Sequence, residues 1–302
     1  MLHRPAPRAN SMIPLLPMRL TFAPATPLRL PPYPGALWRG ALGKALRELA
    51  CITGAQACAD CPVIRRCGYG LLFETRGHAQ AGGLAGHYAE LPHPYVVSPR
   101  TDAGDTSVTL ELTLIGAAAR RHREVLDAAA KLRLNGVPLT LREARPLAIN
   151  AAAKTSFAAE IPQPPAAPPR VRMILEHPLR LRRENRYLTA AEFDFATLFT
   201  ALTRRVSMLH DLEAAAPLRA DYRGLAAAAR AVRVNAVHLE WFDWARYSAR
   251  QRRRIPMGGL IGELALSGEF APLWPWLWLG QWLHVGKGAV MGLGRYRLEA
   301  RP

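Results

Sequence analysis

Two groups of residues in the last quarter of the chain have the types and spacing that phosphate binding requires. Five arginines fall between positions 246 and 254, and a glycine-rich stretch containing one lysine follows at 284–294. Glycine lets a backbone approach a ligand closely and adopt positive φ, and clustered arginines bind a phosphate backbone. The two groups predict an RNA partner. The candidate RNA contacts are Arg246, Arg250, Arg252, Arg253, Arg254, His284, Gly286, Lys287 and Gly288.

The composition agrees with a nucleic-acid partner. The 40 lysines and arginines against 23 acidic residues give a formal net charge of +17, and the pI is near 10.7. Most of the excess is arginine, which suits bidentate phosphate contacts and stacking on bases better than lysine does. The alternative is a solvated basic surface in a protein from an arginine-rich proteome. Half of the residues are hydrophobic, so a substantial core is expected.

No stretch of the chain predicts a membrane span. The most apolar segment, Phe270 to Val285, contains two prolines and is shorter than the ~20 residues that a spanning helix needs. The first 20 residues hold four prolines and lack a small-residue cleavage site, which argues against a signal peptide. We therefore expect a cytoplasmic protein.

All four cysteines, Cys51, Cys58, Cys61 and Cys67, lie within one short window. In a cytoplasmic protein such clustering favours a metal site or reduced thiols over disulfides. The central Cys-x-x-Cys pair has the spacing of a zinc knuckle, and four thiolates would complete a closed tetrahedral zinc site. An iron–sulfur cluster and a loop without metal stay open, because the outer spacings are irregular. In each case the expected role is structural.

The pattern of apolar residues in the first half predicts alternating strands and helices. Strands are expected at 18–23, 94–98 and 107–116, with a pair of further strands within 137–160. Helices are expected at 38–49, where Trp38, Leu42, Leu46 and Leu49 share one face, and at 117–134. This order is the βαββαβ arrangement of a ferredoxin-like (RRM-like) domain.

The same order recurs in the second half. Ile161 to Pro169 contains five prolines and predicts a stiff linker. Beyond it we expect strands at 170–183, 235–244, 257–266 and 294–300, and helices at 192–212, 219–232 and 271–283, the middle helix being an insertion. The predicted class is α+β, with two tandem ferredoxin-like domains. They comprise an N-terminal domain at 1–160 with an inserted four-cysteine loop, the proline-rich linker at 161–169, and a C-terminal domain at 170–302 with the glycine-rich RNA-binding loop.

Several segments carry a resemblance to a known family. In the second half they lie, in order, at His177–Arg182, Phe195–Leu209, Arg246–Gln251, Gly258–Glu263 and His284–Gly294, and in the first half, more loosely, at Trp38–Gly43 and Cys67–Glu74. The chain resembles the CRISPR-associated repeat-RNA endoribonucleases of the RAMP superfamily, which cut precursor CRISPR RNA within its repeats. The resemblance implies two RRM-like domains, a glycine-rich loop against a hairpin repeat RNA, and cleavage without a metal cofactor. It also implies products with a 2′,3′-cyclic phosphate and a 5′-hydroxyl, and retention of the crRNA with other CRISPR effector subunits.

Cleavage without a metal requires the ribose 2′-hydroxyl to attack its own 3′-phosphate. That step needs a base, charge stabilisation on the phosphate and an acid for the leaving 5′-oxygen. Members of the family commonly place a histidine on or near the first helix, but residues 33–49 contain none. Three interpretations stay open: Tyr33, Arg39 and Lys44 act by positioning and electrostatics; one of His78, His87 and His93 enters the site; or His284 and Lys287 contribute. The candidate catalytic residues are Tyr33, Arg39, Lys44 and His87.

The principal hypothesis is therefore a CRISPR RNA-processing endoribonuclease. The missing helix histidine makes a non-catalytic crRNA-binding subunit of an effector complex the alternative. A basic, zinc-containing protein that binds nucleic acid for another purpose is a third interpretation, which the matched C-terminal segments disfavour.

Overall fold

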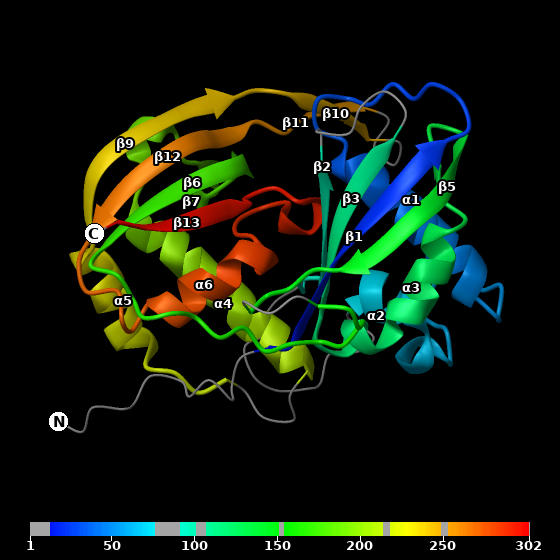
Figure 1. Cartoon of the computed structure of the whole chain (residues 1–302), viewed down its shortest axis with the longest axis horizontal. Coiled ribbons are helices and arrows are strands. Elements are labelled where there is room, and N and C mark those ends of the chain that lie inside the picture. The colour runs from blue at the N-terminus through cyan, green and yellow to red at the C-terminus, as the bar shows by residue number, and fades with distance from the viewer. Residues whose placement is uncertain are drawn as a thin grey trace. The chain divides into compact units, whose positions relative to one another are not determined.

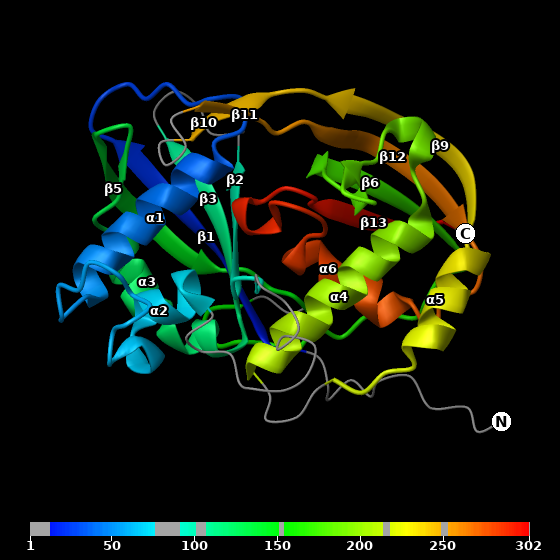
Figure 2. The same cartoon turned by 180° about the vertical axis from the view of Figure 1, so that it is seen from behind.

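The computed structural model describes residues 13–75, 91–100, 107–150, 154–213, 218–248 and 253–301. The chain divides into two compact units. The first unit contains Ala9–Pro162 and Ser207–Leu218, and the second contains Gln163–Val206 and Arg219–Pro302. Figures 1 and 2 show the elements of each unit from opposite sides. Within the described ranges no helix is both long and apolar enough to cross a membrane.

The first unit is built on an antiparallel sheet with the strand order β2-β3-β1-β5-β4. The central strand β1 pairs with β3 from Leu15↔Ile115 to Phe22↔Val108, and with β5 on its other side. The strands β1, β2 and β3 begin and end within a few residues of the predicted positions. The strands are β1 (Leu15–Pro24), β2 (Tyr95–Arg100), β3 (Val108–Ile115), β4 (Arg133–Leu134) and β5 (Val137–Pro146).

Helices cover one face of this sheet (Figure 2). They are α1 (Gly35–Ala50) and α3 (His122–Ala129), while the short α2 (Gly68–Phe73) packs against α1. Trp38, Leu42 and Leu46 of α1 are buried, as the predicted apolar stripe requires. The six-residue α2 was not predicted, because two of its residues are glycines.

Two predictions in the first half are wrong in detail. The region 117–134 is not one helix, since a 3₁₀ helix, η5 (Gly116–Arg121), precedes α3. The chain then turns through Asn135 and Gly136, both at positive φ, into β5. Asn-Gly is the strongest two-residue hairpin signal, and it draws the residues before it into β4. Among the described residues of 137–160, β5 is the one strand that forms, apart from a bridge between Leu15 and Glu160. The strand ends at Pro146, which has no N–H to continue the ladder.

The second unit repeats the topology on a sheet with the order β13-β6-β12-β9. In both units the four main strands follow the spatial order fourth, first, third, second, which the split βαββαβ motif produces. The fold is therefore two tandem ferredoxin-like domains, as predicted. The sheet strands are β6 (Arg170–Leu179), β9 (Arg233–Phe242), β12 (Gly259–Ser267) and β13 (Tyr296–Arg301), and two further hairpins are formed by β7 (Arg182–Arg183) with β8 (Arg186–Tyr187) and by β10 (Ala245–Ser248) with β11 (Arg253–Pro256).

The helices of the second unit are α4 (Phe195–Glu213), α5 (Tyr222–Ala231) and α6 (Trp274–Leu283), and the last residues of α4, from Ser207 on, are grouped with the first unit. Val171, Met173 and Leu175 of β6 are buried at alternate positions, as a strand with one covered face requires. The proline-rich linker is fixed to this unit, because Trp274 Nε1 donates a hydrogen bond to the Pro165 carbonyl at 2.9 Å.

Candidate functional site

A histidine from outside the first helix lies against that helix in the first unit. Arg39 of α1 places a guanidinium nitrogen 3.1 Å from Nε2 of His93, which stands just before β2. Nδ1 of the same imidazole lies 2.7 Å from Oγ1 of Thr75, just after α2. Thr75 is only 3% exposed, whereas Arg39 and His93 are half-buried. The arrangement joins a cation and a titratable base where they remain accessible to a ligand.

The two hydrogen bonds indicate which tautomer of His93 the arrangement requires. A guanidinium has donors and no acceptor, so Nε2 of His93 must be the acceptor of the bond from Arg39. Nδ1 therefore carries the proton and donates to the hydroxyl of Thr75. This tautomer directs the N–H of Nδ1 at Thr75 and the lone pair of Nε2 at Arg39.

Aromatic side chains of helix α2 pack against Arg39 and against a second arginine of α1. The Arg39 guanidinium lies 5.4 Å from the centroid of the Phe73 ring, and that of Arg47 lies 5.8 Å from the ring of Tyr69. The two rings stack with centroids 5.2 Å apart. Gly43 lies between the arginines on α1, and a β-carbon there would come within 2.7 Å of Phe73. The close contact of α2 with α1 thus depends on two cation–π pairs and one glycine.

The three predicted catalytic residues that the structure describes differ in their exposure and in their neighbours. Tyr33 is 7% exposed. Lys44 lies five residues beyond Arg39, about 140° around the helix, and its side chain is 78% exposed beside Glu48. His87 lies outside the described residues. Of this set, Arg39 is the member that contacts another ionisable side chain suited to the reaction.

In the second unit the glycine-rich loop is held by backbone contacts. Gly286 has φ +88, and a β-carbon there would lie 2.6 Å from the Arg180 carbonyl oxygen. The backbone N–H of Lys287 donates to that same oxygen at 2.9 Å, while its side chain is exposed. The short 3₁₀ helix η7 (Ala289–Met291) follows, with Gly288 as its N-cap. The loop therefore presents Lys287 to solvent from a fixed backbone.

His284 lies beneath this loop rather than on its surface. It is 3% exposed, and its Nδ1 donates to the Gly292 carbonyl at 3.0 Å. His177 donates to the same carbonyl at 2.9 Å. Burial, followed by the charge of His177, lowers the pKa of His284 well below its usual value. The ring of His284 thus shapes the loop, and its expected direct contact with RNA is not supported by this position.

The predicted arginine cluster falls on the hairpin formed by β10 and β11. Arg246 pairs with Ile255, and Arg254 pairs with Tyr247. Arg253 pairs with Ser248 in the same ladder. Arg250 and Arg252 lie outside the described residues. This hairpin continues the one formed by β9 and β12, since Met257 N–H donates to the Trp244 carbonyl at 2.8 Å.

Arg180 connects the glycine-rich loop with the base of this hairpin. Its carbonyl accepts from Lys287, and its guanidinium donates to the Pro256 carbonyl at 3.3 Å and to Met257 Sδ at 3.1 Å. The same guanidinium lies 4.3 Å from the centroid of the Tyr187 ring. Arg180, a single buried residue, thus joins the two segments predicted to contact RNA. The sequence patterns did not indicate this role for Arg180.

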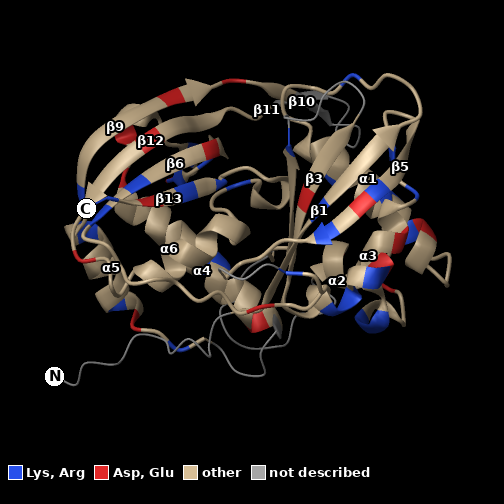
Figure 3. Ribbon diagram, viewed as in Figure 1, with Lys and Arg blue, Asp and Glu red and all other residues tan. Residues whose placement is uncertain are grey.

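The open face of the second sheet is not a free basic surface. Arg172 of β6 forms ion pairs with Glu263 and Glu299, and Glu176 lies 2.7 Å from Arg295. Figure 3 shows positive and negative segments side by side on β6, β12 and β13. The positive charges there are largely neutralised, so the loop and the hairpin are better candidates for phosphate binding.

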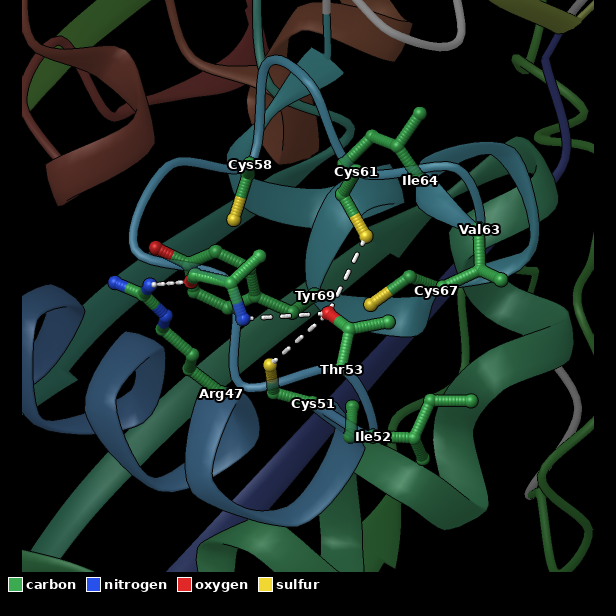
Figure 4. A pocket seen from close by; sticks show the side chains of 12 residues that line it. Arg47, Cys51, Ile52, Thr53, Cys58, Cys61, Val63, Ile64, Cys67 and Tyr69 are labelled. Carbon is green, nitrogen blue, oxygen red and sulfur yellow. Dashed lines mark hydrogen bonds between the residues drawn. The ribbon is translucent and has the colours of Figure 1, made fainter.

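The four cysteines line one pocket between α1 and α2 (Figure 4). All four thiols are free and half-buried. Among the described residues, no group of three or more His, Cys, Asp or Glu side chains is already close enough together to hold a metal ion.

Two family models match the chain. One is described as the AF_1859_N N-terminal domain and covers residues 13–166. The other is the CRISPR-associated endoribonuclease Cas6 and covers residues 173–296. No curated protein matches the chain significantly.

Solved Cas6 structures share the fold. A product complex of Thermus thermophilus Cas6 is 14% identical, with a TM-score of 0.57 over 96% of this chain and 100% of that chain. A product complex of another Cas6 is 15% identical, with a TM-score of 0.55 over 95% of this chain and 100% of that one. A chain of a partial Cas6-RT-Cas1–Cas2 complex is 14% identical, with a TM-score of 0.58 over 98% of this chain and 47% of that one.

The family models and the shared fold agree with the motifs in the sequence. The Cas6 model covers the glycine-rich loop and the hairpin, and the solved Cas6 structures extend the likeness over nearly the whole chain. Residues 173–296 therefore form a domain of the family of CRISPR-associated Cas6 endoribonucleases, and the chain as a whole has the fold of the solved Cas6 structures.

Proposed function

We propose that this chain cuts its cognate CRISPR repeat RNA by metal-independent attack of a ribose 2′-hydroxyl on the adjacent phosphate. The products would carry a 2′,3′-cyclic phosphate and a 5′-hydroxyl. The observation that carries this proposal is the contact between Arg39 and His93, which places a base and a cation side by side on the first unit. Such a pair provides two of the three functions that the reaction requires.

The roles follow from the geometry of the pair. An incoming phosphate competes for the N–H groups of Arg39, because charge-assisted bonds to phosphate are stronger than the bond to a neutral imidazole. Nε2 of His93 is then free to accept the proton of the 2′-hydroxyl. The 2′-oxygen bonds to phosphorus, the bond from phosphorus to the 5′-oxygen breaks, and the leaving oxygen takes a proton from solvent. Arg39 stabilises the charge that develops on the phosphate oxygens.

Thr75 is assigned a positioning role. Its hydroxyl accepts from Nδ1 of His93 and thereby keeps the basic lone pair on Nε2. Tyr33 is too buried to touch RNA and is assigned to the core, and Lys44 is left as a peripheral phosphate contact. His87 stays an untested alternative to His93 as the base.

RNA binding is assigned mainly to the second unit. Lys287 is exposed on a loop whose backbone is fixed by Arg180, and the arginines of the β10–β11 hairpin begin next to the same anchor. We assign the RNA contacts to Lys287, the flanking Gly286 and Gly288, and Arg246, Arg250, Arg252, Arg253 and Arg254. Contacts to phosphates and to the shape of a hairpin need no reading of base edges.

Retention of the cut RNA and contact with other CRISPR proteins extend the proposal. Phosphate contacts in the second unit would survive the chemical step, which supports a slow release of product. A solved relative by fold is part of a Cas6-RT-Cas1–Cas2 complex, which supports protein partners for this chain as well.

The test uses purified full-length chain and its cognate repeat RNA. Wild-type protein should cut the RNA after brief incubation with excess EDTA, and should leave intact a copy with a single 2′-deoxy at the scissile nucleotide. Cutting that stops with EDTA, or that persists on the 2′-deoxy copy, would contradict the mechanism. Intact RNA in both reactions, together with tight binding, would instead favour the non-catalytic crRNA-binding subunit.

A further inference from the structure

The four cysteines are arranged around one pocket by the ends of two helices and the loop between them. Cys51 is the first residue after α1, and Cys67 is the last before α2. Cys58 and Cys61 lie in the intervening loop and are joined by a turn in which Cys61 N–H donates to the Cys58 carbonyl at 3.2 Å. In Figure 4 the sulfur atoms of all four face the same space.

The sulfur atoms of the thiols lie near one another, and a zinc site requires a short separation between them. The hydroxyl of Thr53 lies 4.0 Å from Cys51 Sγ and 3.5 Å from Cys61 Sγ, so these two sulfurs are at most about 7.5 Å apart. In a tetrahedral zinc site with Zn–S bonds of about 2.3 Å, the sulfurs lie roughly 3.8 Å apart. A change of χ1 rotamer moves a cysteine sulfur by about 3 Å. Side-chain rotation can therefore bring these two sulfurs into range without refolding the loop.

The loop has few other stabilising contacts. Only the 3₁₀ helix η2 (Ile64–Arg66) interrupts it, and Ile52 is 82% exposed rather than packed. Arg47 of α1 reaches over it and donates to the carbonyls of Ala55 and Gln56 at 3.0 and 3.1 Å. That guanidinium lines the same pocket and would offset part of the negative charge of four thiolates.

We propose that Cys51, Cys58, Cys61 and Cys67 bind one zinc ion that fastens the end of α1 to the start of α2. Four soft thiolates are a ligand set for zinc or for an iron–sulfur cluster. The cavity between them is about 20 Å³, which is room for one water-sized object. That volume has room for a single ion, and metal and sulfide analysis distinguishes zinc from an iron–sulfur cluster.

The position of the ion gives it a role in the fold. Helix α2 begins directly after Cys67, carries the Tyr69 and Phe73 rings that contact the α1 arginines, and ends just before Thr75. A helix of six residues, such as α2, is too short to be stable alone, so it depends on its contacts with α1 and on the ion. The ion is therefore structural, and it holds the elements from which the Arg39–His93 cluster is built.

Metal content and thiol titration of the full-length chain test this site without reference to RNA cleavage. We expect about one zinc per chain by elemental analysis, released to a chromophoric chelator as about four equivalents of a mercurial reagent are added. Cobalt exchanged for zinc should show the sulfur-to-cobalt charge-transfer bands of a tetrathiolate site. Chain without metal and with four free thiols, or chain with iron and acid-labile sulfide, would overturn the assignment.

A matched pair of variants tests the ligands. Cys58→Ser should lose most of the zinc, while Ala57→Ser, which adds the same hydroxyl next door on an exposed position, should keep it. Full zinc content in Cys58→Ser and in Cys61→Ser would contradict the site. If Cys58→Ser fails to fold, the mercurial titration and the cobalt spectrum of the wild-type chain still decide the question.

Discussion

Replacing Thr75 by valine tests whether the hydrogen bond to His93 matters for catalysis. Valine keeps the shape of the buried side chain and removes the hydroxyl that lies 2.7 Å from Nδ1. A hydrogen bond of this kind contributes about 1 to 1.5 kcal/mol, so the ratio of His93 rings with the lone pair on Nε2 to those with it on Nδ1 should fall roughly five- to tenfold. The single-turnover cleavage rate at saturating RNA should fall by up to the same factor.

The assay separates positioning from folding. The rate constant and the RNA dissociation constant are measured for wild type, Thr75→Val and Thr75→Ser. We expect unchanged RNA affinity in all three, a slower chemical step for valine, and a rate near wild type for serine, which retains the hydroxyl. A valine variant that cuts as fast as wild type, or whose loss lies in affinity alone, would refute the role assigned to this contact.

Three further predictions concern the pH response, the RNA-binding loop and the support of α2. Burial, followed by the charge of the neighbouring His177, lowers the pKa of His284 well below 6.5. As the pH falls below about 6.5, His284 therefore binds a proton in the unfolded chain but not in the folded one. The free energy of unfolding should be unaffected by this residue above about pH 6.5, and should fall below that pH by at most about 1.4 kcal/mol per pH unit. His284→Asn, which tolerates positive φ, should flatten this slope in thermal unfolding between pH 7 and 5, and an equally steep slope would contradict the reasoning. Lys287→Ala should reduce the slope of log K against log salt for RNA binding by about one, whereas Lys131→Ala on the first unit serves as control; equal slopes for both would remove the loop lysine from the interface. In Gly43→Ala the new β-carbon would lie 2.7 Å from the Phe73 ring, so this variant should lose about 1 to 3 kcal/mol of folding stability and cut RNA more slowly. Gly40→Ala on the same helix meets open space and should gain up to about 1 kcal/mol of stability. Equal effects of the two substitutions on stability would rule out the tight contact between α1 and α2.

The periodic part of the fold could be predicted from the sequence. Strands such as β6 alternate Val171, Met173 and Leu175 with exposed residues, and α1 repeats apolar residues at helical spacing. Each signal is local, so it does not depend on the partners that the element meets later. Asn135-Gly136 was an equally local hairpin signal that the reading of 117–134 as one helix missed.

The site itself depends on contacts between distant segments. Arg39 and His93 are 54 positions apart, and Thr75 is 18 positions from His93. Nothing in the spacing selects His93 over His78 or His87, and the candidate catalytic set predicted from the sequence contained His87 instead of His93. Tyr69 and Phe73, four residues apart, could have predicted a short helix with an aromatic face.

The burial of His284 and the role of Arg180 could not be predicted from the sequence either. Both residues lie beside glycines or prolines in motifs that suggest exposure, and only the packed loop shows that they face inward. A histidine next to a glycine-rich loop has the same sequence signature whether it contacts a ligand or supports the turn.

The cleavage rate of a His93→Ala variant tests the central claim most directly. Single-turnover cutting of the cognate repeat RNA is followed for wild type, for His93→Ala, and for His122→Ala on α3 as a control histidine in the same unit. Loss of a general base should slow the reaction on the order of 10² to 10⁴-fold, with RNA affinity unchanged and with the control near wild type. A His93→Ala variant that cuts the RNA at close to the wild-type rate would contradict the account.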